Sequence, residues 1–215
     1  MWTKIDFNEE KHEYSVDGVR VPSVSDILSP LNAERYAGMN PIVLQDAARR
    51  GKAVHEATEA IDYGLEPEEY PDIQGYVDAY YQFLFDHDVS WVMVEHIVSF
   101  SRYEGEPPLY CGTVDRYGVV DGQPAVVDIK TYASMSTEAQ MTASCQTALY
   151  SDAIVACGCR AKRYILHLKK DGKYRLIDLD NFDEKRGWNG PSVAGELLHL
   201  YYEKQTALAG KRGKK

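Results

Sequence analysis

The acidic and basic side chains best placed to do chemistry flank a predicted turn. Asp115 precedes the dipeptide Asp121-Gly122, and Asp128 and Lys130 follow it. Asp-Gly between β-branched runs is the strongest short-range signal for a two-residue hairpin of type I′. In that hairpin Asp115 lies directly opposite Asp128, with Cβ atoms about 5 Å apart. Because side chains alternate along a strand, Lys130 lies on the same face as Asp128.

Two carboxylates and a lysine on one patch of sheet are suited to metal-assisted hydrolysis. On their own, the carboxylates repel each other, and the pKa of one of them is raised. A hard divalent cation removes that penalty, because Mg²⁺ prefers oxygen ligands. The lysine could then orient or deprotonate a metal-bound water. The alternative is an ordinary hairpin with a surface Asp–Lys pair, and the aligned second aspartate favours the metal site.

Composition and charge limit the classes of protein to consider. The 215 residues fit one domain with appendages, and the chain reads as globular, with 44% hydrophobic and 27% charged residues. No apolar run approaches the roughly 20 residues needed to span a bilayer, and the N-terminus lacks a signal peptide, so we expect a cytoplasmic protein. The net charge of −9 argues against bulk attraction to nucleic acid and leaves a local basic groove open.

The four cysteines predict neither a disulfide nor a zinc site. They are Cys111, Cys145, Cys157 and Cys159. Their spacing contains no C-x2-C pair, and the spacing of zinc fingers is absent. A reduced Cys157–Cys159 pair is favoured over a metal site in a cytosolic protein.

Periodicity and caps predict the elements that must position the reactive residues. We expect a hairpin in 3–22, a short helix 24–28, a loop 29–39, helices 40–62 and 72–86, a strand 90–101, the hairpin described above, a helix 137–156, a second hairpin 163–179 and a helix 189–208. This order predicts an α/β (α+β) fold with a mixed central sheet flanked by helices. We expect residues 1–39 to pack as an extension on a main domain of 40–208, followed by a flexible basic tail of 209–215.

Four motifs resemble the PD-(D/E)XK nuclease superfamily, in particular its RecB-like branch of small phage and prophage exonucleases. That branch combines a helical histidine, a G-x-x-D strand, a D-x-K strand and a Q-x-x-x-Y helix in this order. The matching segments are Arg50-Gly51-Lys52-Ala53-Val54-His55, Gly112-Thr113-Val114-Asp115, Asp128-Ile129-Lys130-Thr131 and Gln146-Thr147-Ala148-Leu149-Tyr150. The resemblance covers roughly residues 40–170 and implies a restriction-endonuclease-like αβββαβ core. The proline of the family name is absent, because Val114 precedes Asp115.

The resemblance also implies roles for individual residues. It implies a divalent metal held by three side chains and one backbone carbonyl, those of His55, Asp115, Asp128 and Ile129. Lys130 would position or activate the attacking water and stabilise negative charge at the phosphate. Gln146 and Tyr150 would line the site and contact substrate or hold Lys130, although a plain packing face of the helix remains an alternative.

Further residues near these motifs are weaker candidates. Glu95 could add a carboxylate to the metal site or could be a solvated strand residue. The candidates for contact with the DNA backbone lie close in sequence to His55 or to the D-x-K motif, and they are Arg49, Arg50, Lys52 and Thr131.

The expected activity is that of a Mg²⁺-dependent deoxyribonuclease, an exonuclease acting in DNA repair or recombination, with Mn²⁺ as a substitute metal. An iron–sulfur cluster is not expected, because iron–sulfur members of the branch carry a C-x2-C pair that is absent here. The family also implies a single-strand-annealing protein as a partner, and because ring-forming relatives exist, a homo-oligomer stays open. Two alternatives remain: a structure-specific endonuclease of the same superfamily, and a nucleic-acid-binding module without catalysis.

Overall fold

A five-stranded mixed sheet forms the centre of the fold. The computed structural model describes residues 4–68, 71–154 and 161–212. The sheet has the order β4-β5-β6-β7-β8, with β6 and β7 parallel and the other neighbours antiparallel. Its strands are β4 (Val89–Phe100), β5 (Tyr110–Val120), β6 (Gln123–Lys130), β7 (Lys162–Leu168) and β8 (Tyr174–Asp178). The predicted mixed sheet is therefore confirmed.

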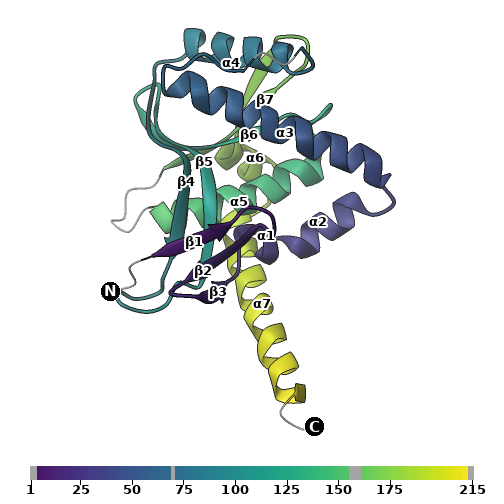
Figure 1. Cartoon of the computed structure of the whole chain (residues 1–215), viewed down its shortest axis with the longest axis vertical. Helices are drawn as coiled ribbons and strands as arrows, with labels where there is room; N and C mark the ends of the chain where they lie inside the picture. The colour runs from purple at the N-terminus through teal and green to yellow at the C-terminus, as the bar shows by residue number, and fades with distance from the viewer. Residues whose placement is uncertain (1–3, 69–70, 155–160, 213–215) are drawn as a thin grey trace.

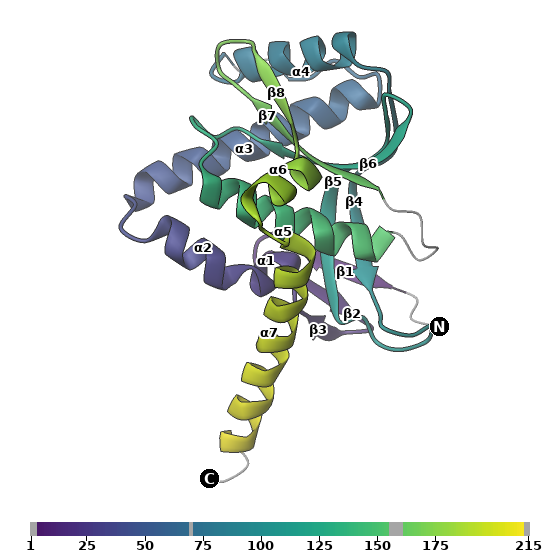
Figure 2. The same cartoon turned by 180° about the vertical axis from the view of Figure 1, so that it is seen from behind.

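Helices cover both faces of this sheet. On one face, α3 (Pro41–Asp62) and α4 (Gln74–Asp86) pack on β5, β6 and β7 around Val54, Phe83 and Ile129. On the other face, α1 (Val24–Ile27), α5 (Thr137–Ile154) and α7 (Gly190–Arg212) pack around Val126, Leu149 and Ala194. The described elements thus have the predicted order of helix, three strands, helix and strand, and α7 extends well beyond the rest of the fold (Figures 1 and 2).

The N-terminal segment forms its own small sheet against β5. Strands β1 (Ile5–Asn8), β2 (Glu13–Val16) and β3 (Val19–Val21) are antiparallel, so the predicted hairpin gains a third strand. The Tyr14 hydroxyl lies 2.8 Å from Thr113 Oγ1 of β5. This sheet therefore forms a wall beside the strand that carries Asp115.

The hairpin that organises the candidate chemistry has the predicted turn. Asp121 and Gly122 have φ values of 50° and 76°, both positive as a type I′ turn requires. Val120 pairs with Gln123, and the ladder continues to Arg116 and Val127, which confirms the predicted register over these residues.

Three segments differ from the sequence-based expectation. The expected loop 29–39 contains the helix α2 (Ser29–Tyr36), whose second residue is a proline, a residue that fits the first turn of a helix. The second predicted hairpin forms as β7 and β8, but it is followed by an unpredicted helix, α6 (Leu179–Arg186), which Asp178 caps and Gly187 ends with a left-handed φ of 62°. Helix α7 continues to Arg212, so the tail predicted to begin at 209 is helical over its first residues.

The described residues bear on the cysteine and membrane-span predictions only in part. Cys111 and Cys145 are buried free thiols, whereas Cys157 and Cys159 lie outside those residues. Within 4–68, 71–154 and 161–212, no helix has the length and apolar character needed to cross a membrane.

One pair of glycine substitutions tests how closely α4 packs. A Cβ at Gly75 would lie 1.9 Å from the backbone oxygen of Lys170, whereas a Cβ at Gly195 in α7 meets nothing within 4 Å. We expect Gly75→Ala to lower the free energy of unfolding by about 1–3 kcal/mol. Gly195→Ala should raise it by about 0.5–1 kcal/mol, because alanine favours the helix. Urea unfolding measures both, and a Gly75→Ala variant as stable as the wild-type protein would contradict this close packing of α4.

Candidate functional site

Three potential metal ligands from three elements meet at one point. His55 of α3, Glu95 of β4 and Asp115 of β5 each offer an atom within 4.8 Å of the other two. His55 Nδ1 lies 2.8 Å from Glu95 Oε1, and His55 Nε2 lies 3.8 Å from Asp115 Oδ2. Asp115 is buried, and the other two are half-buried. A nitrogen and two carboxylates in this arrangement suit a divalent cation.

Glu95 reaches this cluster through an unusual backbone. Its φ is 42°, in the left-handed region that a glutamate rarely adopts. The neighbours Val94 and His96 pair with Arg116 and Val114, so Glu95 lies across from Asp115. Backbone strain of this kind is common at functional sites. The alternative that Glu95 is a solvated strand residue is wrong, because its carboxylate contacts His55.

A second chain of polar contacts starts at Asp128. Lys130 Nζ donates to Asp128 Oδ1 at 2.7 Å and to Gln146 Oε1 at 3.4 Å, and Gln146 Nε2 donates to the Tyr150 hydroxyl at 3.3 Å. The other carboxylate oxygen of Asp128 is buried, with no hydrogen-bond partner among the described residues. A buried carboxylate oxygen without a donor is costly unless a cation or water satisfies it.

A hydrogen bond between the two strands joins these contacts into one site. The ladder between β5 and β6 ends at Arg116 and Val127, and the next β5 residue, Asp115, accepts the N–H of Ile129 at 2.6 Å through Oδ2. Asp115 is thereby fixed beside the strand segment that carries Asp128 and Lys130. Ile129 takes part in the site through this N–H, whereas the resemblance implied its carbonyl. The cluster of three potential metal ligands contains Glu95, whereas the resemblance implied Asp128 in that place.

Arg116 binds Glu95 from the buried side of the site, a role that the sequence did not predict. Its side chain is fully buried. It donates to Glu95 Oε1 at 2.8 Å, to Asp62 Oδ2 at 2.6 Å and to Thr58 Oγ1 at 2.9 Å. The signal in the sequence was an arginine directly after Asp115 in a mostly apolar strand. The contacts indicate that Arg116 fixes the Glu95 carboxylate that faces His55.

Burial and charge shift the pKa values of the clustered groups. Burial lowers the pKa of His55, but the Asp115 charge and the Glu95 hydrogen bond outweigh it and raise that pKa to about 9. Burial raises the pKa of Asp115 to about 6. Burial also lowers the pKa of Lys130, yet the charge of Asp128 leaves it above its ordinary value. Lys130 is therefore a persistent cation rather than a proton acceptor at neutral pH.

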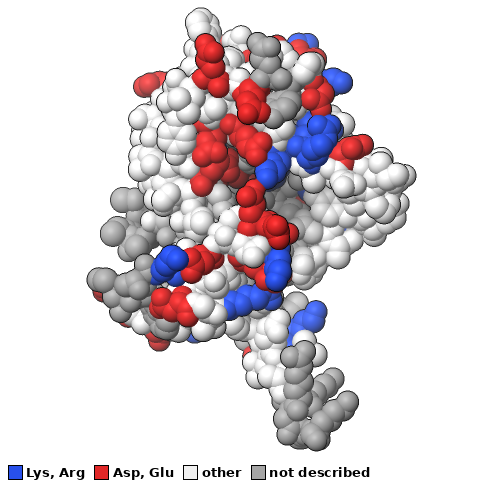
Figure 3. All heavy atoms as spheres, viewed as in Figure 1, with Lys and Arg blue, Asp and Glu red and all other residues white. Residues whose placement is uncertain are grey.

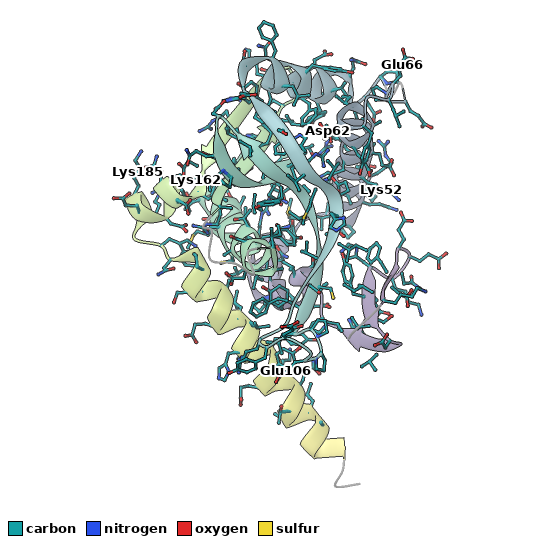
Figure 4. The ribbon with its side chains drawn as sticks, turned by 90° about the vertical axis from the view of Figure 1, so that its left-hand side faces the viewer. Lys52, Asp62, Glu66, Glu106, Lys162 and Lys185 are labelled. Carbon is teal, nitrogen blue, oxygen red and sulfur yellow. The ribbon has the colours of Figure 1, made fainter. Side chains whose placement is uncertain are left out.

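The four candidates for DNA contact lie in different places. Arg49 is exposed and pairs with Asp72 at 3.0 Å. Lys52 pairs with Glu9 at 2.5 Å beside the N-terminal sheet, and Figure 4 shows it projecting from α3 toward that sheet. Arg50 and the buried Thr131 both line a cavity next to Lys130. The structure thus brings only Arg50 and Thr131 of this set together.

Two cavities meet at His55. The first, here called the acidic cleft, has a volume of about 790 Å³ and lies between the N-terminal sheet and α3. It contains most of the candidate ligands, and its carboxylates are Glu9, Glu56, Glu59, Glu95 and Asp115. Figure 3 shows acidic side chains gathered around a hollow on this face. The second, of about 720 Å³, lies between α2, α3 and residues 131–136 and contains Lys130.

Comparison with known proteins gives little further information. No protein-family model and no curated protein matches the sequence. One solved structure, described as "Crystal structure of SSO0001", is similar to this chain with a TM-score of 0.43 and 14% identity. The match covers 84% of this chain and 75% of that chain. The function must therefore be inferred from the site itself.

Proposed function

We propose that this protein is a divalent-metal-dependent deoxyribonuclease, an exonuclease of the phage or prophage type that acts in DNA repair or recombination. The observation that carries the proposal is the convergence of His55, Glu95 and Asp115 beside the Lys130–Asp128 pair. Carboxylate-bound metals with a neighbouring cation suit the hydrolysis of phosphodiesters. The sequence resemblance to RecB-like nucleases supports the same reaction.

The residues present fit a hard divalent cation. His55, Glu95 and Asp115 would hold it, and the buried Oδ2 of Asp128, which has no hydrogen-bond partner among the described residues, would be a further ligand. Mg²⁺ is the expected ion, and Mn²⁺ should replace it because manganese tolerates a histidine nitrogen among oxygen ligands. Such an ion would lower the pKa of bound water and neutralise charge on the phosphate.

The chain's own residues account for binding and orientation. Lys130 Nζ, kept protonated by Asp128, would donate to a phosphate oxygen and stabilise the charge that develops there. Gln146 accepts a hydrogen bond from Lys130 and donates to the Tyr150 hydroxyl, which limits the orientations that Lys130 can take. Glu95, which Arg116 holds in place, would keep His55 oriented.

Digestion of labelled DNA tests the proposal. End-labelled linear DNA and closed circular DNA are incubated with Mg²⁺, Mn²⁺ or EDTA, beside the Lys130→Ala variant. We expect metal-dependent loss of linear DNA only, absent with EDTA and in the variant. The order in which labelled ends disappear gives the polarity.

Two other results would redirect the proposal. Nicking of closed circles would identify an endonuclease of the same chemistry. Intact DNA with a folded protein in every metal would overturn the nuclease and favour a binding module.

A further inference from the structure

The cavity beside Lys130 differs in charge from the acidic cleft. Among the described residues that line it, the Lys and Arg side chains are Arg35, Arg50 and Lys130, and none is Asp or Glu. The guanidinium Nε of Arg50 is buried without a hydrogen-bond partner in the described chain. A polyanion is therefore attracted to this cavity, whereas the carboxylates of the acidic cleft repel it and attract metal ions.

The walls of this cavity are aromatic and apolar. The Arg35 guanidinium lies 4.2 Å from the centre of the Tyr132 ring and 5.1 Å from that of Tyr36. Arg35 also donates to the Tyr132 hydroxyl at 3.2 Å, which orients both groups. Met39 and Val43 line the same cavity with 45% and 55% of their surface exposed. Stacked aromatic and guanidinium planes with exposed apolar neighbours are typical of sites that hold nucleotide bases.

Gly51 lines both cavities and has no side chain to fill either of them. It lies within α3 and lines both cavities, as Ala48 and His55 do. A glycine inside a helix costs about 0.5–1 kcal/mol relative to alanine. A Cβ here would meet only Thr131 Oγ1, at an ordinary 3.9 Å, so packing does not require the glycine. A bare backbone at this point leaves room for a chain that passes from one cavity to the other.

We propose that the cavity lined by Arg35, Tyr36 and Tyr132 binds an unpaired base of single-stranded DNA, with the adjoining phosphate at Lys130. The lining has the chemistry for both parts, a π-face for the base and cations for the backbone. Bases inside a duplex are stacked on one another and cannot enter such a cavity without leaving the stack. The inference rests on the proposed nuclease function and specifies its substrate as a single strand or a frayed end.

Binding measured without cleavage separates this inference from the nuclease proposal. Fluorescein-labelled dT20, an abasic strand of the same length and a blunt duplex are titrated with the protein in EDTA, and anisotropy gives Kd. We expect dT20 to bind at least about tenfold more tightly than the abasic strand or the duplex. Tyr132→Ala should remove that advantage, and Tyr132→Phe should keep it within about twofold because the ring remains. Equal affinity of wild-type protein for dT20 and the abasic strand would overturn the inference, even if the nuclease is active.

A second pair of variants changes only exposed side chains. Val43 and Ile42 are neighbours on α3 with 55% and 66% exposure, and only Val43 lines the cavity. Val43→Glu places a carboxylate among the three cations and should weaken binding of dT20 by at least about fivefold. Ile42→Glu changes the net charge equally and should leave the affinity within about twofold. Equal effects of the two substitutions would show that the strand does not occupy this cavity.

Discussion

Asp115→Asn should lower the rate of metal-dependent DNA cleavage by at least about 10³-fold while the protein stays folded. Asp115 is the carboxylate that contacts both parts of the site, through His55 Nε2 at 3.8 Å and the N–H of Ile129 at 2.6 Å. Asparagine keeps an oxygen that can accept the Ile129 hydrogen bond but removes the negative charge that a cation needs. The rate of release of end label in Mg²⁺ measures the loss.

A second aspartate in the same hairpin provides the control. Asp121→Asn makes the same chemical change in the turn, where asparagine before glycine also favours type I′. We expect this variant to cleave at the wild-type rate. Asp128→Ala and Lys130→Ala should abolish cleavage as Asp115→Asn does. Their thermal unfolding should remain a single cooperative transition. Normal cleavage by these variants would show that the reaction takes place elsewhere.

The other large effect is on stability and comes from Arg116. Arg116→Met should lower the free energy of unfolding by about 3–5 kcal/mol, because it leaves the buried Asp62 and the half-buried Glu95 without their shared cation. The side-chain exposures are 0% for Arg116 and 3% for Asp62, so water cannot replace the lost bonds. Urea unfolding in EDTA measures the difference.

An exposed ion pair provides the matched comparison. Arg49→Met removes an arginine that pairs with Asp72 at 3.0 Å in solvent and should cost less than about 1 kcal/mol. Combining Arg116→Met with Asp62→Asn should recover part of the loss, because the orphaned carboxylate is then neutral. If Arg116→Met and Arg49→Met unfold at the same urea concentration, the buried network does not stabilise the fold.

Local signals in the sequence determined much of the fold. Asp121-Gly122 predicted the hairpin and its register, Ser23 and Asn40 predicted two helix starts, and the structure confirms each. These features depend on backbone preferences and hydrogen bonds within a few residues, so short stretches of sequence are enough to predict them. Helix α6 was missed although its cap is equally local, because the predicted strand ended at Leu179 and residues 180–188 were left without a predicted element.

The grouping of several candidate site residues was predictable to the same extent. Asp115, Asp128 and Lys130 belong to one hairpin, and the turn that connects its strands places them near each other. Gln146 and Tyr150 are four residues apart on one helix, a spacing that brings two side chains to the same face. The hydrogen bonds from Lys130 to Gln146 and from Gln146 to the Tyr150 hydroxyl agree with that prediction.

Only the tertiary structure decided which ligands form the cluster and what surrounds it. His55 and Glu95 are 40 residues apart, and Arg116 joins Glu95 to Asp62, which is 54 residues before it. The two cavities likewise depend on the tertiary structure, because α3 lines one of them together with α2 and the other together with the N-terminal sheet. Contacts across such separations depend on how whole elements pack, and the spacing of neighbouring residues does not predict that packing. The sequence by itself therefore determined the hairpin and which candidate residues it carries, whereas the packing of α2, α3 and β4 decided the geometry of the candidate site.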